Sequence, residues 1–139
     1  MKFLSATSAL AFAALAALAA PQAKAASIAS LAGPWAATII GTTACGATSM
    51  YATFTLNSAG TGNATTTYHT ANCGDSTSTN PFSISSLNSA GAGAANLSCG
   101  SGCGWALNIQ LLPGGKLFTL VDVSPGNPNN YIEGTAVFQ

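Results

Sequence analysis

Charged side chains are almost absent from this chain of 139 residues. It contains three Lys or Arg residues, three Asp or Glu residues and a single His. None of the basic residues is arginine. General acid–base catalysis, metal coordination and phosphate binding all depend on these side chains. We therefore predict that the protein is not an enzyme and that it uses neither a metal nor a cofactor.

The first 25 residues have the pattern of an export signal. Lys2 supplies a short basic start, an apolar run extends from Leu4 to Ala20, and Ala23-Lys24-Ala25 ends in the small-x-small pattern that signal peptidase cleaves. A retained membrane anchor is the alternative, and Pro21 with the short polar stretch after it favours removal. No other apolar run approaches the ~20 residues of a membrane helix. We predict cleavage after Ala25, a secreted product in the extracellular space or periplasm, and no transmembrane segment in the mature chain.

Residues 26–139 have the length of one small domain. Their ionisable acids and amines are Lys116, Asp75, Asp122 and Glu133, with His69 as the single imidazole. Nucleic acids and anionic lipids are bound by clusters of Lys and Arg, so neither is an expected partner. A surface with so little charge is either wetted by Ser, Thr, Asn and Gly, or it associates with other molecules.

Cysteine usage agrees with export. Cys45, Cys73, Cys99 and Cys103 are an even number behind an export signal, which favours two disulfides in an oxidising compartment. Zinc is the alternative, but only one closely spaced pair is present.

Apolar and polar residues alternate with a period of two along most of the mature chain. In 50–56 every second residue is apolar, and the same holds for 105–111. This alternation is typical of antiparallel strands with one buried face and one wet face, and Gly-, Asn- and Pro-rich clusters between the runs predict tight turns. The expected strands are 35–41, 50–57, 63–70, 82–87, 94–99, 105–112, 117–123 and 131–138.

Eight short strands joined by short turns predict an all-β fold, an up-and-down antiparallel barrel. Closure removes the sheet edges, which this chain has almost no charged residues to protect. A β-sandwich is the alternative. Alternate turns of a meander lie at one end, so all four cysteines are expected at the same rim. That placement favours the pairs Cys45–Cys73 and Cys99–Cys103.

Gly33-Pro34-Trp35 precedes the first expected strand. It resembles the Gly-x-Trp opening of the calycins, the group of lipocalins and avidins, whose eight-stranded barrels begin this way. The resemblance implies that Trp35 packs at the closed end of a barrel. Lipocalins usually bring a basic residue from late in the chain over that Trp, whereas this chain has only Lys116 near the start of the seventh strand. The biotin-contact pattern of avidins does not map onto this sequence. The chain also resembles small exported bacterial proteins of unassigned function.

The candidate ligand-binding residues are those expected near the cysteine rim: His69, Asp75, Trp105 and Asp122. A His–Asp pair can orient a ligand or serve as an ordinary hydrogen bond at the rim, and Trp105 can line a barrel mouth or pack in the core. We found no serine or cysteine with a base to activate it, and hence no catalytic residue.

Two functions from different classes follow. The first is a secreted, non-catalytic binding module that takes a small neutral or apolar ligand, or a neutral glycan, at the barrel mouth. The second is a structural or adhesive extracellular protein that self-associates through its uncharged surface. An internal cavity walled by alternate residues of the second and sixth strands would favour the first function. A filled interior would favour the second.

Overall fold

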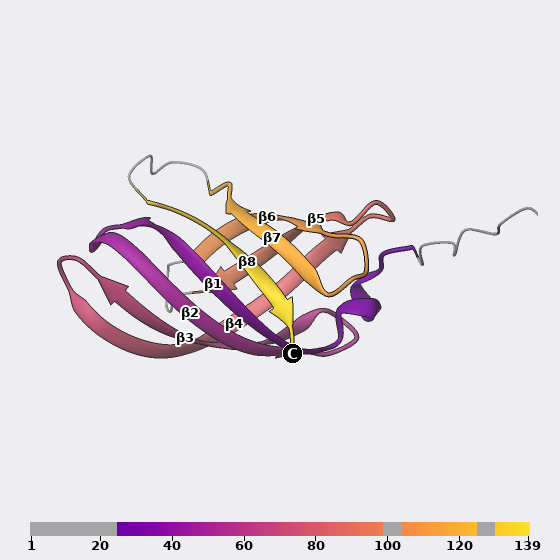
Figure 1. Ribbon diagram of the computed structural model, residues 1–139, viewed down its shortest axis with the longest axis horizontal. Coiled ribbons are helices and arrows are strands. Elements are labelled where there is room, and N and C mark those ends of the chain that lie inside the picture. The colour runs from indigo at the N-terminus through magenta and orange to yellow at the C-terminus, as the bar shows by residue number, and fades with distance from the viewer. Residues whose placement is uncertain (1–24, 99–103, 125–129) are drawn as a thin grey trace, which may run out of the picture.

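The computed structural model describes residues 25–98, 104–124 and 130–139. Eight antiparallel strands form a closed barrel in chain order, each paired with its sequence neighbours, and the last pairs with the first (Figure 1). The prediction of an eight-stranded up-and-down barrel is therefore confirmed. The elements are η1 (Ile28–Leu31), β1 (Gly33–Thr43), β2 (Gly46–Leu56), β3 (Thr61–Thr70), β4 (Gly74–Leu87), β5 (Ala92–Ser98), β6 (Gly104–Leu111), β7 (Leu117–Asp122) and β8 (Tyr131–Phe138).

The period of two in the sequence determines which side chains face inward. Along β2, buried and exposed residues alternate from Ala47 to Leu56, and β6 alternates in a similar way. The apolar inward residues of both strands belong to one continuous buried cluster. They therefore pack into a common core instead of standing apart around an open space.

The strands are strongly tilted, as the pairing register shows. Leu87 pairs with Gly93, which pairs with Ile109, and Ile109 pairs with Leu120. On the far side of the barrel the same row continues through β8, β1, β2 and β3, and it returns to β4 at Ser76. Such a stagger is required to close a barrel of this size. Two paired residues on neighbouring strands consequently do not lie at the same height along the barrel axis. The residue at the same height is about one position away from the paired one on each successive strand.

Two hairpin loops at one end have the same construction. The side-chain Oδ1 of Asn57 accepts hydrogen bonds from the amides of Ala59 and Thr61 at 2.9 and 3.1 Å. Asn88 accepts two equivalent bonds, both at 3.0 Å, in the β4–β5 loop. Each loop then contains a glycine with positive φ, 78° at Gly60 and 86° at Gly91. The similar sequences of these loops thus correspond to similar turns.

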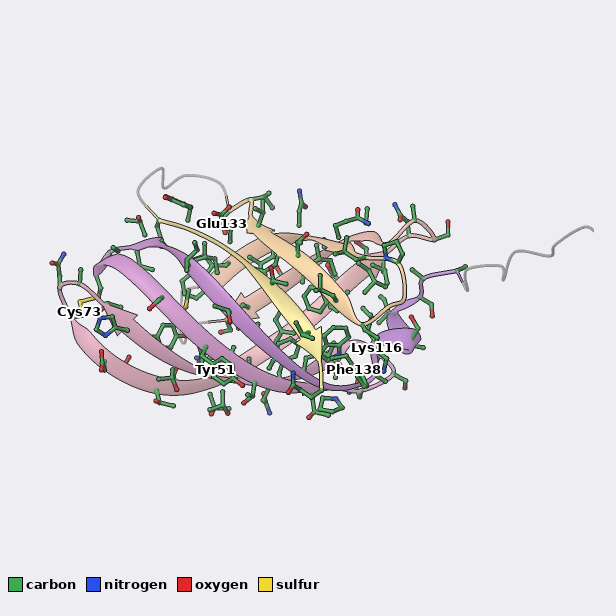
Figure 2. The ribbon with its side chains drawn as sticks, viewed as in Figure 1. Tyr51, Cys73, Lys116, Glu133 and Phe138 are labelled. Atoms are coloured by element: carbon green, nitrogen blue, oxygen red, sulfur yellow. A yellow bond between two sulfur atoms is a disulfide. The ribbon has the colours of Figure 1, made fainter. Side chains whose placement is uncertain are left out.

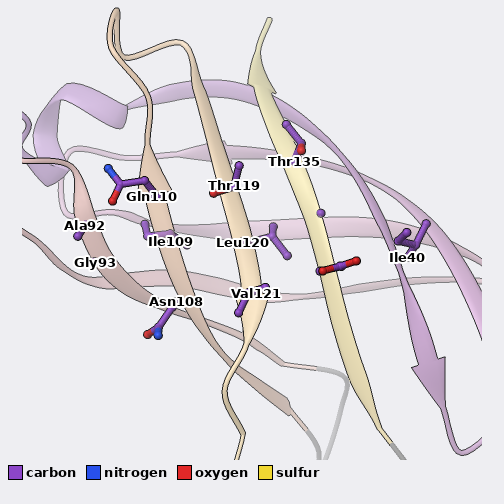
Figure 3. A pocket seen from close by; sticks show the side chains of 12 residues that line it. Ile40, Ala92, Gly93, Asn108, Ile109, Gln110, Thr119, Leu120, Val121 and Thr135 are labelled. Atoms are coloured by element: carbon purple, nitrogen blue, oxygen red, sulfur yellow. The ribbon is translucent and has the colours of Figure 1, made fainter.

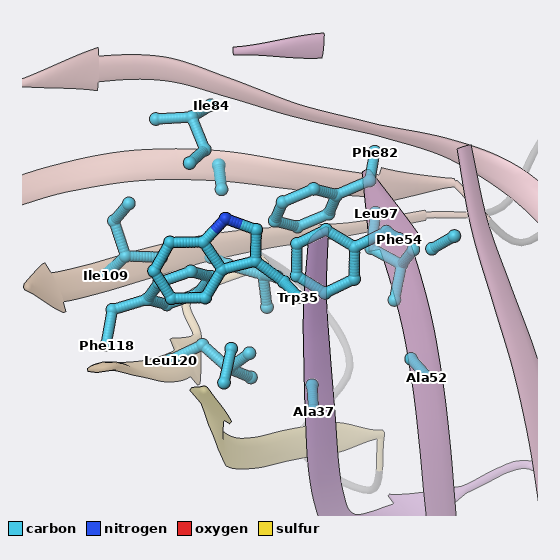
Figure 4. Close-up of a cluster of buried hydrophobic side chains, with 14 of the residues drawn as sticks. Trp35, Ala37, Ala52, Phe54, Phe82, Ile84, Leu97, Ile109, Phe118 and Leu120 are labelled. Atoms are coloured by element: carbon cyan, nitrogen blue, oxygen red, sulfur yellow. The ribbon is translucent and has the colours of Figure 1, made fainter. Parts of the chain in front are cut away.

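The end of the barrel that carries these loops is closed by aromatic packing (Figure 4). Trp35 is 1% exposed and lies 4.9 Å from Phe118 and 5.3 Å from Phe138, measured between ring centroids. Its indole Nε1 donates a 2.8 Å hydrogen bond to the carbonyl oxygen of Leu31 in η1. The short N-terminal segment is therefore fixed over the closed end.

Lys116 lies at this same end. Its Nζ is 3.8 Å from the centroid of the Phe138 ring, and both residues lie far from Cys73 (Figure 2). Because Phe138 in turn packs edge-on against Trp35, the chain's late basic residue contacts the tryptophan's neighbour, not the tryptophan itself. A cation over an aromatic face is attracted by the ring quadrupole.

At the opposite end, β1 to β4 are longer than expected and project beyond β5 to β8 (Figure 1). The largest difference is in β4, which begins at Gly74, whereas the sequence predicted a strand only from residue 82. Residues 74–81 are Ser-, Thr- and Asn-rich on both faces, so they lack apolar alternation. They form a strand because β3 offers a complete partner, from the pair Thr70–Gly74 to the pair Thr61–Ser83.

A disulfide joins the tips of the two projecting hairpins. Cys45 in the β1–β2 turn is bonded to Cys73 in the β3–β4 turn, which confirms the predicted pair. The other predicted pair, Cys99–Cys103, lies outside the described residues. The strands on either side of it are paired up to Ser98 and Gly104.

Candidate functional site

The barrel interior changes from apolar to polar toward the cysteine end. The inward residues there form what we call the polar mouth: Thr48, Thr66, Tyr68, Ser78 and Asn80. Asn80 Nδ2 donates to Ser78 Oγ at 2.8 Å, and Ser78 Oγ donates to the Tyr68 hydroxyl at 3.4 Å. A chain of side-chain hydrogen bonds therefore lines the β3–β4 side of the interior.

Three buried side-chain atoms in the described part of the chain have no hydrogen-bond partner in the protein: Thr66 Oγ1, Trp105 Nε1 and Asn130 Oδ1. Thr66 is 0% exposed and Trp105 is 7% exposed. A buried polar group without a partner costs roughly 1–3 kcal/mol, and such groups are uncommon in folded proteins. Three of them in one small domain therefore need an explanation.

All three atoms belong to the cysteine half of the interior. Thr66 is paired with Ala52 and Ser78. Asn130 lies two residues before the buried Ile132 of β8, so by the alternation of that strand it is on the inward side. Trp105 begins β6 at the same end. When the offset of about one residue per strand is applied, Thr66, Asn80 and Trp105 fall at nearly the same height along the barrel axis. The unpartnered atoms thus share the cysteine half of the interior, and the closed end contains none among the described residues.

The predicted site residues are divided between the two faces of the wall. His69 and Asp75 are a cross-strand pair of β3 and β4, with His69 Nδ1 2.5 Å from Asp75 Oδ1. Both side chains are about three-quarters exposed, at 76% and 74%, and they follow the outward parity of their strands. The pair therefore lies on the outer wall near the projecting tips and does not face the interior.

Asp122 and Trp105 follow the inward parity instead. Asp122 is half-buried at the end of β7, and its Oδ1 accepts a 2.8 Å hydrogen bond from the amide of Ser124. The Ser124 hydroxyl in turn accepts a 2.8 Å bond from the amide of Ala106, next to Trp105. The structure therefore brings Asp122 and Trp105 together through neighbouring strands, and separates both from His69 and Asp75.

The outer wall has a shallow groove of about 770 Å³ across β5 to β8 and β1 (Figure 3). Its sides are two rows of outward residues that run across paired strands. One, the Glu133 row, consists of Asn108, Val121, Glu133 and Ile40. The other, the threonine row, consists of Gln110, Thr119, Thr135 and Thr38. Between them the floor is formed by Gly93, Ile109, Leu120 and Gly134.

A second hollow of about 540 Å³ adjoins the groove and shares Ile40 and Glu133 with it. His69 and Tyr131 also line it. Pairing through Ser49 places His69 in line with Ile40 and Glu133. Glu133, which the sequence did not suggest as a site residue, thus shares the outer wall with His69.

Comparisons with known proteins give no relative from which to transfer a function: no protein-family model matches the chain, and no curated protein matches it. Within the described ranges, no three His, Cys, Asp or Glu side chains are grouped so as to hold a metal ion. No helix in those ranges is long and apolar enough to cross a membrane.

Sequence analysis missed Thr66 and Asn130 because one threonine or asparagine among many has no distinctive signal. The period of two does predict their inward parity once the strands are known. What it does not predict is which inward polar atoms lack partners, since that depends on the stagger of the closed barrel.

Proposed function

We propose that this protein is a secreted, non-catalytic binding module that takes a small neutral ligand or a neutral glycan at the polar mouth of the barrel. The observation that carries the proposal is the group of buried polar atoms without partners, Trp105 Nε1, Thr66 Oγ1 and Asn130 Oδ1. A bound molecule would supply the hydrogen bonds that the protein itself does not.

The donor and acceptor types of these atoms restrict the ligand. An indole N–H only donates, an amide oxygen only accepts, and a threonine hydroxyl does both. A ligand that satisfies all three must therefore carry both acceptors and donors, as hydroxylated and amide-bearing molecules do. Asp122 is close to Trp105, and the described part of the mouth has no cationic side chain. An anionic ligand would be repelled there, which favours a neutral one.

The apolar interior is filled, which is the outcome expected for the self-associating alternative, so the proposed site is confined to the polar mouth. Thr66 is fully buried, and a ligand therefore reaches its hydroxyl only if residues at the mouth move apart. On the neighbouring strand β2, Thr66 is flanked by the small side chain of Ala52 and the flexible side chain of Met50. Such a site would trade some stability of the free protein for binding, because its unpartnered atoms are unfavourable until a ligand is bound.

Thr66→Val tests this trade, since valine has nearly the shape of threonine without the hydroxyl. We expect the free energy of unfolding of the variant to be about 1 kcal/mol higher than that of the wild type, because an unsatisfied buried group has been removed. We expect its affinity for the ligand to fall about tenfold, the equivalent of roughly 1.4 kcal/mol. Urea unfolding and calorimetric titration with glucose, N-acetylglucosamine and the anionic glucuronate measure the two effects.

Thr65→Val is the matched control, because Thr65 is the neighbouring residue of β3, faces outward and bonds Thr79 Oγ1 at 3.0 Å. It should change neither binding nor the preference for neutral sugars. Native mass spectrometry of the protein from its natural source identifies an endogenous ligand, and the same spectrum reports whether residues 1–25 have been removed. A Thr66→Val protein less stable than the wild type, together with no ligand from the natural source, would contradict the proposal.

We further propose a calycin-like relationship and export from the cytoplasm. The first is supported by Trp35 at the closed end of an eight-stranded barrel. The second is supported by the Cys45–Cys73 disulfide, which persists in oxidising compartments.

A further inference from the structure

The outer wall of the barrel has two chemically different halves. Of the large apolar side chains that are strongly exposed, six lie on or next to β7, β8, β1 and β2; these are Ile40, Tyr51, Val121, Val123, Tyr131 and Val137, which we call the apolar half. None of the large apolar side chains with strong exposure lies on β3, β4 or β5 among the described residues. Those strands present hydroxyls instead, including the bonded pairs Thr65–Thr79 and Thr67–Thr77.

The middle of the apolar half is the groove between the Glu133 row and the threonine row. Ile40 is 53% exposed and Val121 is 44% exposed, and each pairs directly with Glu133 across a strand boundary. The two aliphatic side chains are poorly hydrated, whereas the carboxylate between them is strongly hydrated. A partner that covers these aliphatic groups must also supply a hydrogen-bond donor to the carboxylate.

We propose that the apolar half docks on the same surface of a second copy of this chain, with a two-fold axis along the groove. This inference is independent of the ligand proposed for the barrel interior. A two-fold rotation about the groove places the Glu133 row of one copy over the threonine row of the other. Glu133 then faces Thr135 of the second copy, whose hydroxyl donates to the carboxylate. Val121 covers the methyl group of Thr119, and Ile40 covers that of Thr38.

Three properties of the chain favour a second copy as the occupant. The surface is self-complementary, since each row offers what the other requires. Copies repel one another little, because Glu133 is the single charged residue of the two rows. The strands that carry the apolar half, β7, β8, β1 and β2, are each paired on both sides, so association on this face must use side chains and not added strands.

The size of the surface indicates a weak dimer. Four strands at about 4.8 Å spacing, each presenting about six residues, cover roughly 20 by 20 Å. This area of about 400 Å² is roughly half of the 800 Å² that a stable interface buries on each partner. We therefore expect association that depends on concentration between about 1 μM and 1 mM and that salt hardly changes.

Sedimentation velocity over this concentration range, on the oxidised full-length mature protein, tests the proposal. The wild type should shift from monomer toward dimer, and Val121→Lys should raise the dissociation constant at least tenfold. Asn96→Lys is the matched control, because it adds the same charge to an exposed strand residue outside the apolar half. Wild-type protein that remains monomeric at 1 mM, or equal effects of the two variants, would overturn the proposal.

Cross-linking tests the register separately from the affinity. Glu133→Cys and Thr135→Cys proteins are oxidised by air, alone and as a mixture. If the two rows face each other, the mixture forms disulfide-linked dimers faster than either protein alone. Faster linkage of Glu133→Cys to itself would contradict the axis along the groove.

Discussion

Trp35 and Trp105 place the same side chain in two different hydrogen-bonding situations. Both are buried, at 1% and 7% exposure. Trp35 Nε1 donates to the Leu31 carbonyl, whereas Trp105 Nε1 has no partner in the protein. The difference separates a tryptophan that closes the barrel from one whose indole N–H has no partner. In the sequence both are aromatic residues near the start of a strand, and only Trp35 is part of a Gly-x-Trp pattern.

Phenylalanine at each position should reveal this difference. Both substitutions lose similar apolar area, but Trp35→Phe also leaves the buried Leu31 carbonyl without its donor. We expect Trp35→Phe to lower the free energy of unfolding by about 1–3 kcal/mol more than Trp105→Phe does. Urea denaturation of the ligand-free proteins measures both values. Equal losses would mean that the Trp35 hydrogen bond contributes nothing net to stability.

At the same scale, the sequence predicted residue identities at the site better than residue orientations. His69 and Asp75 do form a close pair, but they occupy outward positions of their strands and cannot reach Trp105 through the wall. The orientation of His69 follows from the alternation of side chains along β3. Ala64 and Thr66 face inward, and His69, an odd number of residues after Thr66, faces outward. The sequence shows that side chains alternate between the two faces of each strand. It shows which of them face inward only when one inward residue of that strand is already known.

Strands were predictable where apolar alternation is strong, as in β2 and β6. They were underestimated where the inward residues are polar. The first half of β4 lines the polar mouth with Ser78 and Asn80, so burial of apolar side chains does not mark it as a strand. Its pairing with β3 and the cross-strand threonine contacts hold it in place. The part of the fold that sequence patterns missed is thus the part that forms the candidate site.

The disulfide acts on these same elements, because it ties the β1–β2 hairpin to the β3–β4 hairpin at the tips farthest from the core. Cys45 and Cys73 are 28 residues apart, and closure of a loop of this size restricts the unfolded chain by roughly 3–4 kcal/mol. We expect the Cys45→Ala, Cys73→Ala double variant to lose about that much stability in urea. Disulfide mapping by mass spectrometry must first show that the remaining cysteines have not re-paired.

Hydrogen exchange locates the effect of the disulfide within the barrel. In the double variant, amides of the projecting tips, such as those of Ala71 and Asn72, which donate to the carbonyls of Ala47 and Cys45, should lose protection first. Amides at the closed end should follow only the global change. Uniform loss of protection would indicate that the disulfide stabilises the whole barrel and not the mouth in particular.

For the whole molecule, the scarcity of charge and the closed topology are connected. An open sheet protects its edges with charged residues, bulges or prolines, and this chain has almost no charge to use. Closure between β1 and β8 removes the open edges of those two strands. The exposed aliphatic side chains of the outer wall are concentrated on the strands around that closing pair, so this part of the wall is the surface on which we expect copies to meet.

The β1–β8 closure depends on close approach of the two backbones at glycine. A Cβ added to Gly134 would lie 2.3 Å from the Thr38 carbonyl oxygen and 2.9 Å from the Ile39 Cα, both of them backbone atoms. Gly134→Ala must therefore push β8 away from β1, and we expect a loss of about 1–3 kcal/mol, as for other overpacked sites. Gly104→Ala on β6 is the control, since a Cβ added there would be 3.2 Å from the nearest backbone atom, the Leu97 carbonyl oxygen.

Urea unfolding compares the two proteins, and hydrogen exchange should show the loss of protection first in the paired amides of β1 and β8. If Gly104→Ala were the more destabilising variant, closure at this pair would not limit the stability of the barrel.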